Sequence, residues 1–255
     1  MKQTKTNLTT PFDIPILMYL PDDEVTKIVI AVHGFSGSKA SRVTKAVAER
    51  LTAQHTAVIA FDFPAHGESK EDERMLTVEN CQNALSQVAD FAEREFPHVY
   101  DFGIFATSFG GYITLSCVDR LKEQLGDFSM VLRAPAVKMH FSLLRILNIT
   151  EDDLIRAGAA KTNFGERPIT VTYDFFRDIK AHDVYYDNDM SFMIIHGDRD
   201  TIVTRDDIFG YLSINGDAVY APVKNATHTF DHPGDVEKIV GYADMWFTYR
   251  AQNFD

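Results

Sequence analysis

The sequence predicts an α/β fold: a mostly parallel central sheet with helices on both faces and a small inserted cap. Short, nearly continuous apolar runs alternate with segments whose apolar residues recur at helical spacing. Strands that alternate with helices form crossover connections, and these build parallel sheets. One stretch, residues 138–189, interrupts the alternation. The length of 255 residues and the 45% hydrophobic content fit a single domain over 1–255.

Six apolar runs are the expected strands. The first, residues 27–32, is nearly continuous and β-branched, as in a strand that is covered on both faces. The others are residues 57–61, 102–106, 128–132, 191–195 and 218–223. In such sheets ligands bind at the carboxyl ends of the strands, so the residues that follow each strand are the candidates for function.

The expected helices lie between these strands. Apolar residues at helical spacing indicate helices over residues 38–54, 110–121 and 235–249. A further helix is expected to begin after Thr77, whose hydroxyl suits an N-cap, and to end near Pro97.

Residues 138–189 are the predicted cap subdomain, inserted between two strands of the sheet. The segment is rich in aromatic side chains, which together favour an apolar or aromatic acyl group in the substrate. Any single one of them is more commonly part of a cap's own core. The predicted substrate-binding residues are Phe141, Leu144, Phe175, Phe176 and Tyr185, and Leu143, Phe164 and Tyr186 are further candidates.

The charge balance excludes several kinds of partner. Lys and Arg number 25 against 37 Asp and Glu, which leaves a formal net charge of -12. A nucleic-acid binder or a protein docked on an anionic membrane needs a basic surface, so we expect neither partner. The same charge disfavours anionic substrates through long-range repulsion. The N-terminal segment lacks the pattern of a signal peptide, and the expected location is cytoplasmic.

A serine stands where the strand at 102–106 meets a helix. Small residues lie two positions before and two after Ser108, with Ala106 in place of the usual glycine and Gly110 following. A sharp strand-to-helix turn lifts such a serine above the sheet, and only small side chains fit beside it. The pattern alone is weak, but its place between a strand and a helix favours a nucleophile over an incidental serine.

A serine nucleophile needs a base and an orienting carboxylate. Of the nine histidines, His228 follows the last expected strand, which fits the chain order Ser, Asp, His; His232 is its competitor. Residues 196–203 follow the preceding strand and offer two carboxylates, Asp198 and Asp200. Because glycine and aspartate also form ordinary turns, the residues alone leave this choice open.

Two backbone N–H groups are needed to stabilise an oxyanion. One would come from Phe109, directly after the serine. The other would come from the loop at 33–38, His-Gly-Phe-Ser-Gly-Ser, where Gly34 and Gly37 let the backbone turn its amides inward.

Taken together, these segments resemble the α/β-hydrolase family over nearly the whole chain. Residues 62–69, Asp-Phe-Pro-Ala-His-Gly-Glu-Ser, look like a structural loop of that family. The resemblance implies that the nucleophile, acid and base are Ser108, Asp200 and His228, and that the second oxyanion amide is that of Phe35. Within the family, the His-Gly-Phe-Ser-Gly loop and the short aromatic cap are most similar to bacterial cinnamoyl and feruloyl esterases and related small carboxylesterases.

The resemblance implies a serine carboxylesterase that acts on small esters with apolar or aromatic acyl groups and needs no cofactor. No metal site is expected, because Pro233 and Gly234 place His228 and His232 in a loop without a third ligand. A thioesterase, an acylglycerol lipase or a peptidase would use the same triad. A hydrolase-fold protein that binds without catalysis is the alternative of another class. The expected partner is a small-molecule ester, and the oligomeric state stays open, with a homodimer among the options.

Overall fold

The computed structural model describes residues 1–251 except 164 and 166, and it describes no side chains at 249–251. Phe164, a candidate from the cap, therefore lies outside the described residues. The main sheet of this part of the chain contains β1 (Lys2–Leu8), β2 (Ile14–Leu20), β3 (Lys27–Val32), β4 (Thr56–Phe61), β5 (Phe102–Thr107), β6 (Phe128–Arg133), β9 (Met193–Gly197) and β10 (Val219–Val223).

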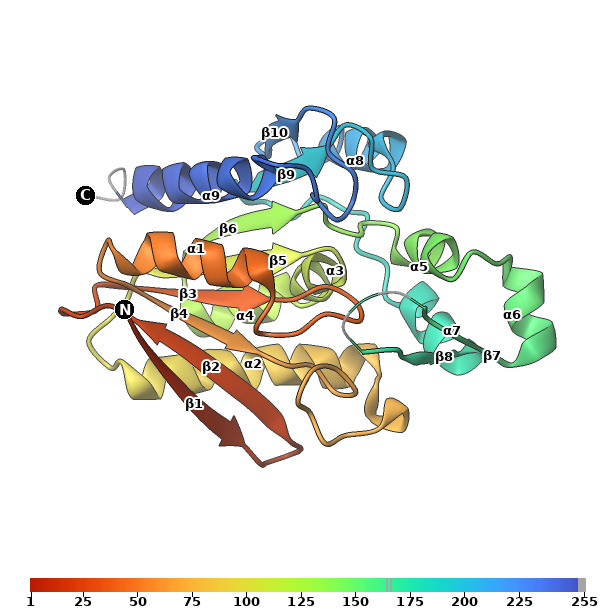
Figure 1. Cartoon of the computed structure of the whole chain (residues 1–255), viewed down its shortest axis with the longest axis horizontal. Coiled ribbons are helices and arrows are strands. Elements are labelled where there is room, and N and C mark those ends of the chain that lie inside the picture. Colours follow the sequence, from red (N-terminus) through yellow and green to blue (C-terminus); the bar gives the residue numbers. More distant parts are fainter. Residues whose placement is uncertain (164, 166, 252–255) are drawn as a thin grey trace.

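The order across this sheet is β1-β2-β4-β3-β5-β6-β9-β10 (Figure 1). The strands from β4 to β10 pair in parallel, whereas β1 and β2 are antiparallel additions at one edge. The register places Ala106 opposite Val32, and Thr107 opposite Arg133. The carboxyl ends of β3, β5 and β6 therefore meet at one edge, and the predicted mostly parallel α/β fold is confirmed.

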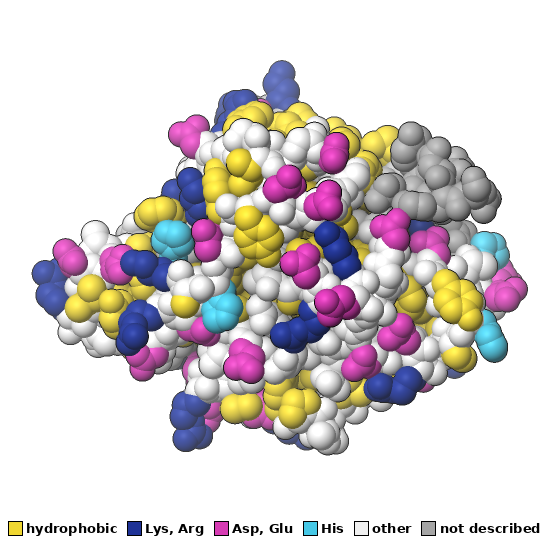
Figure 2. Space-filling model, turned by 180° about the vertical axis from the view of Figure 1, so that it is seen from behind, with side chains coloured by type: hydrophobic (Ala, Val, Ile, Leu, Met, Phe, Trp, Pro, Cys, Tyr) yellow, Lys and Arg dark blue, Asp and Glu magenta, His cyan; other side chains and the backbone are white. Residues whose placement is uncertain are grey.

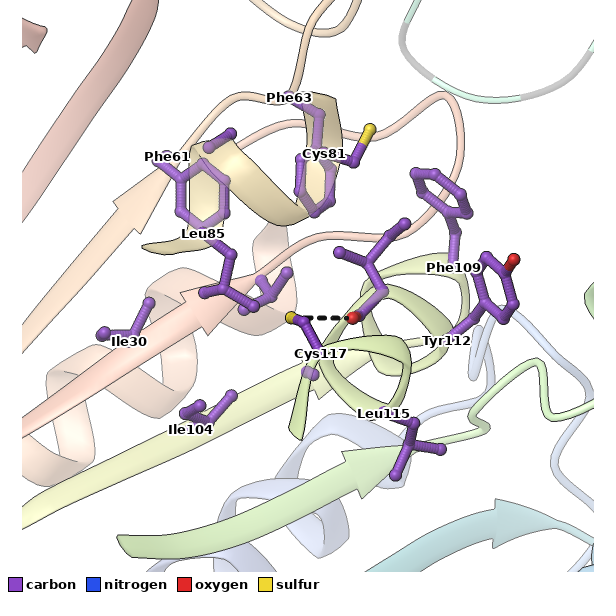
Figure 3. Close-up of a cluster of buried hydrophobic side chains, with 14 of the residues drawn as sticks. Ile30, Phe61, Phe63, Cys81, Leu85, Ile104, Phe109, Tyr112, Leu115 and Cys117 are labelled. Atoms are coloured by element: carbon purple, nitrogen blue, oxygen red, sulfur yellow. Dashed lines mark hydrogen bonds between the residues drawn. The ribbon is translucent and has the colours of Figure 1, made fainter. Parts of the chain in front are cut away.

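Helices cover both faces of the sheet. One face carries α1 (Arg42–Thr52) and α9 (Asp235–Ala251), whose apolar side chains share a core cluster with Val29, Phe105 and Val131. The other face carries α2 (Val78–Glu95), α3 (Phe109–Ser116) and α4 (Val118–Leu125). Figure 3 shows part of this second core, where the free thiols of Cys81 and Cys117 are buried among aromatic and aliphatic side chains. The helix predicted after Thr77 is α2, with the Thr77 hydroxyl accepting from the Asn80 N–H.

The structure corrects two sequence expectations. The helix predicted over 110–121 is broken at Cys117 into α3 and α4. Leu115 and Val118, on either side of the break, are buried in the same core, so the apolar pattern carries no mark of it. The strands β1 and β2 were not predicted either. β1 is mostly polar and exposed at the sheet edge, whereas β2 is a buried apolar run that contains a proline, Pro15.

The inserted segment lies between β6 and β9 in the chain. It contains α5 (Met139–Leu147), α6 (Glu151–Ala157), the antiparallel pair β7 (Ala159–Lys161) and β8 (Thr170–Thr172), and α7 (Tyr173–Ala181). Figure 1 shows these elements gathered beyond the carboxyl ends of β5 and β6. Its role as a cap stays a prediction. Two further short helices are η1 (Glu73–Met75), before α2, and α8 (Arg205–Leu212), after β9.

The surface matches the composition. On the face seen in Figure 2, acidic and basic side chains lie interspersed. Among the described residues, no helix combines the length and apolar character that crossing a membrane requires.

Candidate active site

Ser108 lies at the turn between β5 and α3 in a backbone conformation that few residues adopt. Its φ is 48° and its ψ is -109°. Its N–H donates to the Arg133 carbonyl at 2.9 Å, and its carbonyl accepts from Tyr112 and Ala136. A left-handed conformation costs a non-glycine residue free energy, and such strain persists where surrounding contacts hold it, often at functional sites.

The small residues after the serine have a steric reason. A Cβ atom on Gly110 would lie 2.5 Å from the His33 carbonyl oxygen and 2.7 Å from that of Val32. A Cβ atom on Gly111 would lie 2.9 Å from Pro135 Cβ. The first turn of α3 therefore packs directly on the end of β3, which brings the loop after β3 beside Ser108.

His228 and Asp200 complete a chain of hydrogen bonds with this serine. His228 Nε2 lies 3.0 Å from Ser108 Oγ, and Nδ1 lies 2.7 Å from Asp200 Oδ2. His228 comes from the loop after β10 and Asp200 from the loop after β9. With Nδ1–H donating to the carboxylate, Nε2 is free to accept the serine proton. The structure thus brings together the three residues that the sequence suggested.

The carboxylate of Asp200 is fully buried and held on both oxygens. Its Oδ1 accepts from the N–H groups of Ile202 at 2.8 Å and Val203 at 2.9 Å, while Oδ2 faces the histidine. These amides fix the orientation of the carboxylate, so that Oδ2 points at His228. Asp198 instead accepts from the Asn225 N–H at 2.6 Å, so it links the loop after β9 to the loop after β10.

His232, the other candidate for the base, makes different contacts. The N–H of His232 donates to Asp235 at the start of α9, and its ring is not among the partners of Ser108 or Asp200 in the described residues.

His196 is a neighbour of the carboxylate that sequence reasoning did not assign. Its Nε2 lies 2.9 Å from the Val203 carbonyl and 3.6 Å from Asp200 Oδ2. Burial lowers the pKa of His196, which keeps the ring neutral as a donor to Val203. His196 therefore fixes the loop that carries Asp200. The feature of the sequence that could have indicated this role is its place two residues before Asp198.

The two candidate oxyanion amides belong to segments that lie beside the nucleophile. The Phe109 N–H belongs to the first turn of α3, where N–H groups have no acceptor within the helix. A Cβ on Gly34 would contact Ser108 Cβ at 3.4 Å, so the loop that carries Phe35 lies against the serine. The rings of Phe35 and Phe109 pack edge to face at 5.3 Å between centroids.

The segment 62–69 ties this loop to its neighbour. The fully buried Asp62 accepts from the Lys39 N–H at 2.7 Å, from Lys39 Nζ at 2.5 Å and from the Glu68 N–H at 2.8 Å. Hydrogen bonds from Lys39 and Lys5 lower the pKa of Glu68 to about 2. Gly67 has φ +48, and a Cβ there would collide with Asp62. These contacts agree with a structural loop.

A cavity of about 400 Å³ lies over Ser108 and His228. Loop residues 33–37 form part of its wall, and the N-terminus of α1 and the end of β6 form another part. Its described apolar side chains are Phe35, Val43 and Ile146, and its described charged ones are Arg42, Arg133 and Asp231. Sequence reasoning assigned no role to these three charged residues.

The five predicted substrate-binding residues lie elsewhere. None is among the described residues of this cavity wall. Phe175 is buried behind it and stacks on Phe35 at 6.1 Å, and Phe176 is fully buried. Phe141 and Tyr185 line a separate cavity of about 300 Å³, and Leu144 lies in a shallow groove beside α5. Among the described residues of the inserted segment, Ile146 and Gly165 reach the cavity over Ser108.

Sequence comparison places the chain in a family. The family model described as serine aminopeptidase, S33, matches residues 23–152, slightly more than half of the chain. The chain belongs to this serine hydrolase family. Its matched region includes the elbow at Ser108 and the loop at 33–38. None of the curated protein sequences matches the chain.

Solved structures share the fold of this S33 family member at low sequence identity. Est1E from Butyrivibrio proteoclasticus, solved with ferulic acid bound, superposes with a TM-score of 0.84 at 18% identity over 97% of this chain and 100% of that one. A putative hydrolase from Agrobacterium vitis S4 gives 0.79 at 19% identity, with 96% and 98% covered. Mouse alpha/beta hydrolase domain-containing protein 10 gives 0.78 at 15%, with 98% and 100% covered. The α/β-hydrolase fold is thereby confirmed.

Proposed function

We propose that this serine hydrolase cleaves small carboxylic esters through an acyl-enzyme formed on Ser108. The observation that carries the proposal is the relay from Ser108 Oγ through His228 to Asp200, with distances of 3.0 and 2.7 Å. A nucleophile, a base and an orienting carboxylate in hydrogen-bond contact are the arrangement that acyl transfer requires.

The reaction proceeds in two steps. Ser108 attacks the ester carbonyl while His228 takes its proton, and the protonated ring then returns the proton to the departing alcohol. A water molecule activated by His228 next cleaves the acyl-enzyme. Asp200 holds the ring and stabilises its charged form throughout. The amides of Phe35 and Phe109 would stabilise the tetrahedral oxyanion by about 3 kcal/mol per donor.

The cavity supports a small substrate. A volume of about 400 Å³ fits a short acyl group, and Phe35, Val43 and Ile146 offer the apolar contacts for an aliphatic or aromatic portion. Peptidase activity at a free N-terminus is less well supported, because an ammonium group would face the guanidinium groups of Arg42 and Arg133.

The first test is covalent labelling. A fluorophosphonate probe should label the wild-type protein, and Ser108→Ala should abolish labelling while the thermal unfolding midpoint stays close to that of the wild type. Ser36→Ala, which changes another serine of the cavity wall, is the matched control and should still be labelled.

A substrate panel then separates the alternatives. We expect p-nitrophenyl esters or methyl ferulate to be cleaved faster than acyl-CoAs or aminoacyl amides. A well-folded wild-type protein that resists the probe would favour a binding protein without catalysis. Preferred cleavage of acyl-CoAs or of amides would replace the esterase proposal with a thioesterase or a peptidase.

A further inference from the structure

Arg133 ends the strand beside that of the nucleophile. It is the last residue of β6 and pairs with Thr107 of β5. Leu132 packs in the core under α2 and α3, and Val131 in the core under α1 and α9. Side chains alternate along a strand, so the Arg133 side chain projects to the side of α1, where it lines the cavity over Ser108.

The guanidinium of Arg133 is held in place but only partly paired. Its Nε donates to Thr107 Oγ1 at 3.3 Å, and its Cζ lies 5.0 Å from the centroid of the Phe230 ring. Its Nη1 is buried and has no hydrogen-bond partner among the described residues. No carboxylate in the described part of the chain lies within 4.0 Å of this guanidinium.

A buried donor without a partner costs free energy, and more so when it is charged. Burial lowers the pKa of Arg133 to about 10, with Asp200 and Asp231 opposing the shift, so the group is still charged at neutral pH. Because Arg133 lines the cavity, an anion bound there could accept a hydrogen bond from the unpaired Nη1.

A second cationic group lines the same cavity. Arg42 is the first residue of α1, and its Nη2 donates to the Phe230 carbonyl at 3.1 Å. Ser41 and Val43, on either side of Arg42 in the chain, also line the cavity, so the positive end of the α1 dipole faces it.

Two aspartates near the cavity carry the negative charge that would repel a bound anion, and both already have partners. Asp200 is engaged by His228 and two backbone amides. Asp231, at the exposed part of the wall, accepts from the Thr229 hydroxyl. The two guanidinium groups thus outnumber the one carboxylate of the wall that is not already bound within the triad.

We propose that Arg133, assisted by Arg42, binds a free carboxylate of the substrate, so that the preferred substrates are esters that also carry a carboxylate. The inference rests on the proposed esterase function and narrows its substrate class. It revises the expectation, drawn from the net charge of -12, that anionic substrates are disfavoured. Two guanidinium groups inside a small cavity act at contact distance, whereas the net charge acts at long range through screened solvent.

The test compares two esters that differ only in the group at the end of the acyl chain, a carboxylate in one and a methyl group in the other. Mono-p-nitrophenyl adipate and p-nitrophenyl hexanoate have equally long acyl chains and the same leaving group. We expect the wild-type protein to show the higher kcat/KM on the adipate half-ester. We define the charge preference as kcat/KM on the adipate half-ester divided by kcat/KM on the hexanoate. Arg133→Met should lower this ratio by about 10- to 100-fold, as for loss of a charged hydrogen-bond partner. Arg42→Met should lower it less, because Arg42 is exposed.

The matched control is Arg205→Met. Arg205 also stacks on a phenyl ring, with its Cζ 5.2 Å from the Phe209 centroid, but it is not among the described residues of the cavity wall. Its substitution should leave the ratio unchanged. Arg133→Lys, which keeps the charge but loses the planar fork, should restore part of the preference.

A second ester pair places the carboxylate on the alcohol. 3-Carboxyphenyl butyrate and its neutral carbamoyl analogue repeat the comparison. The pair whose ratio of charged to neutral kcat/KM falls more in Arg133→Met shows which side of the ester faces Arg133. The proposal is overturned if Arg133→Met changes the ratio of neither pair, or if it lowers kcat/KM equally for charged and neutral esters, as a purely structural role would.

Binding to Ser108→Ala separates the two proposals. Calorimetry should show that adipate binds this variant and that adding Arg133→Met weakens binding about tenfold or more. If no ester is cleaved and the probe does not label the protein, the esterase proposal fails, while Arg133-dependent adipate binding would still support the carboxylate site. If the protein cleaves only neutral esters and does not bind adipate, the proposed carboxylate site is wrong while the esterase proposal stands.

Discussion

Asp198 and Asp200 lie two residues apart in one loop, yet the fold gives their carboxylates different partners. Asp200 is buried against His228, with two amides on its other oxygen, whereas Asp198 accepts from the Asn225 N–H. Sequence alone cannot rank two aspartates in a glycine-containing turn. Their roles differ because β9 and β10 bring the loop of His228 to one of them.

Substitution of these two residues should therefore have very different effects. Asp200→Asn should lower kcat by about 10⁴-fold, because an amide beside Nδ1 favours the wrong tautomer and stabilises no imidazolium. Asp198→Asn should cost only a few-fold, since an amide oxygen can still accept from Asn225. Steady-state kinetics on a p-nitrophenyl ester measure both, and the reverse ranking would mean that Asp198 is the acid.

At the scale of elements, the contact between α3 and β3 positions the site. Gly110 allows the first turn of α3 to lie on the carbonyls of Val32 and His33. That contact brings the loop of Phe35 close to Ser108, next to the first turn of α3 that carries Phe109. The glycine was visible in the sequence as part of the elbow pattern, but the backbone that it touches was not.

A methyl group at this position should separate the two elements. Gly110→Ala is expected to destabilise the fold by about 1–3 kcal/mol through overpacking, and to lower kcat by displacing the elbow. Gly241→Ala, in α9, is the matched control: a Cβ there meets nothing within 4 Å, so the change should stabilise the protein by about 0.5–1 kcal/mol. Urea unfolding measures both; equal stability of the two variants would contradict the packing argument.

At the scale of the whole molecule, the fold buries a histidine in neutral form. His66 is fully buried, its Nδ1 lies 2.8 Å from the Pro64 carbonyl, and its ring packs against Phe35 and Phe109. Burial, together with the nearby His33, lowers the pKa of His66 well below 6.5. The unfolded chain therefore takes up a proton near pH 6.5 that the folded protein does not bind.

Stability should consequently fall on acidification. Because the unfolded state binds more protons, the free energy of unfolding should decrease as the pH drops below 6.5, by up to about 1.4 kcal/mol per pH unit from this one group. His66→Phe should make the dependence shallower between pH 6.5 and 5, whereas His98→Phe, at an exposed position, should not. Urea denaturation across this range measures the slope, and an unchanged slope in His66→Phe would exclude His66 as its source.

The sequence by itself determined the parallel sheet, the nucleophile turn and a short set of candidates for base and acid. These features depend on local patterns: apolar runs, small residues beside Ser108, and polar residues that directly follow strands. Only the tertiary structure decided which of them meet. His228 lies 120 residues from Ser108 and 28 from Asp200 in the chain. The cavity wall, with Arg42 and Arg133, likewise depends on strand order and on which face each side chain takes. No local pattern encodes such contacts, because they arise when distant strand ends are packed at one edge of a sheet.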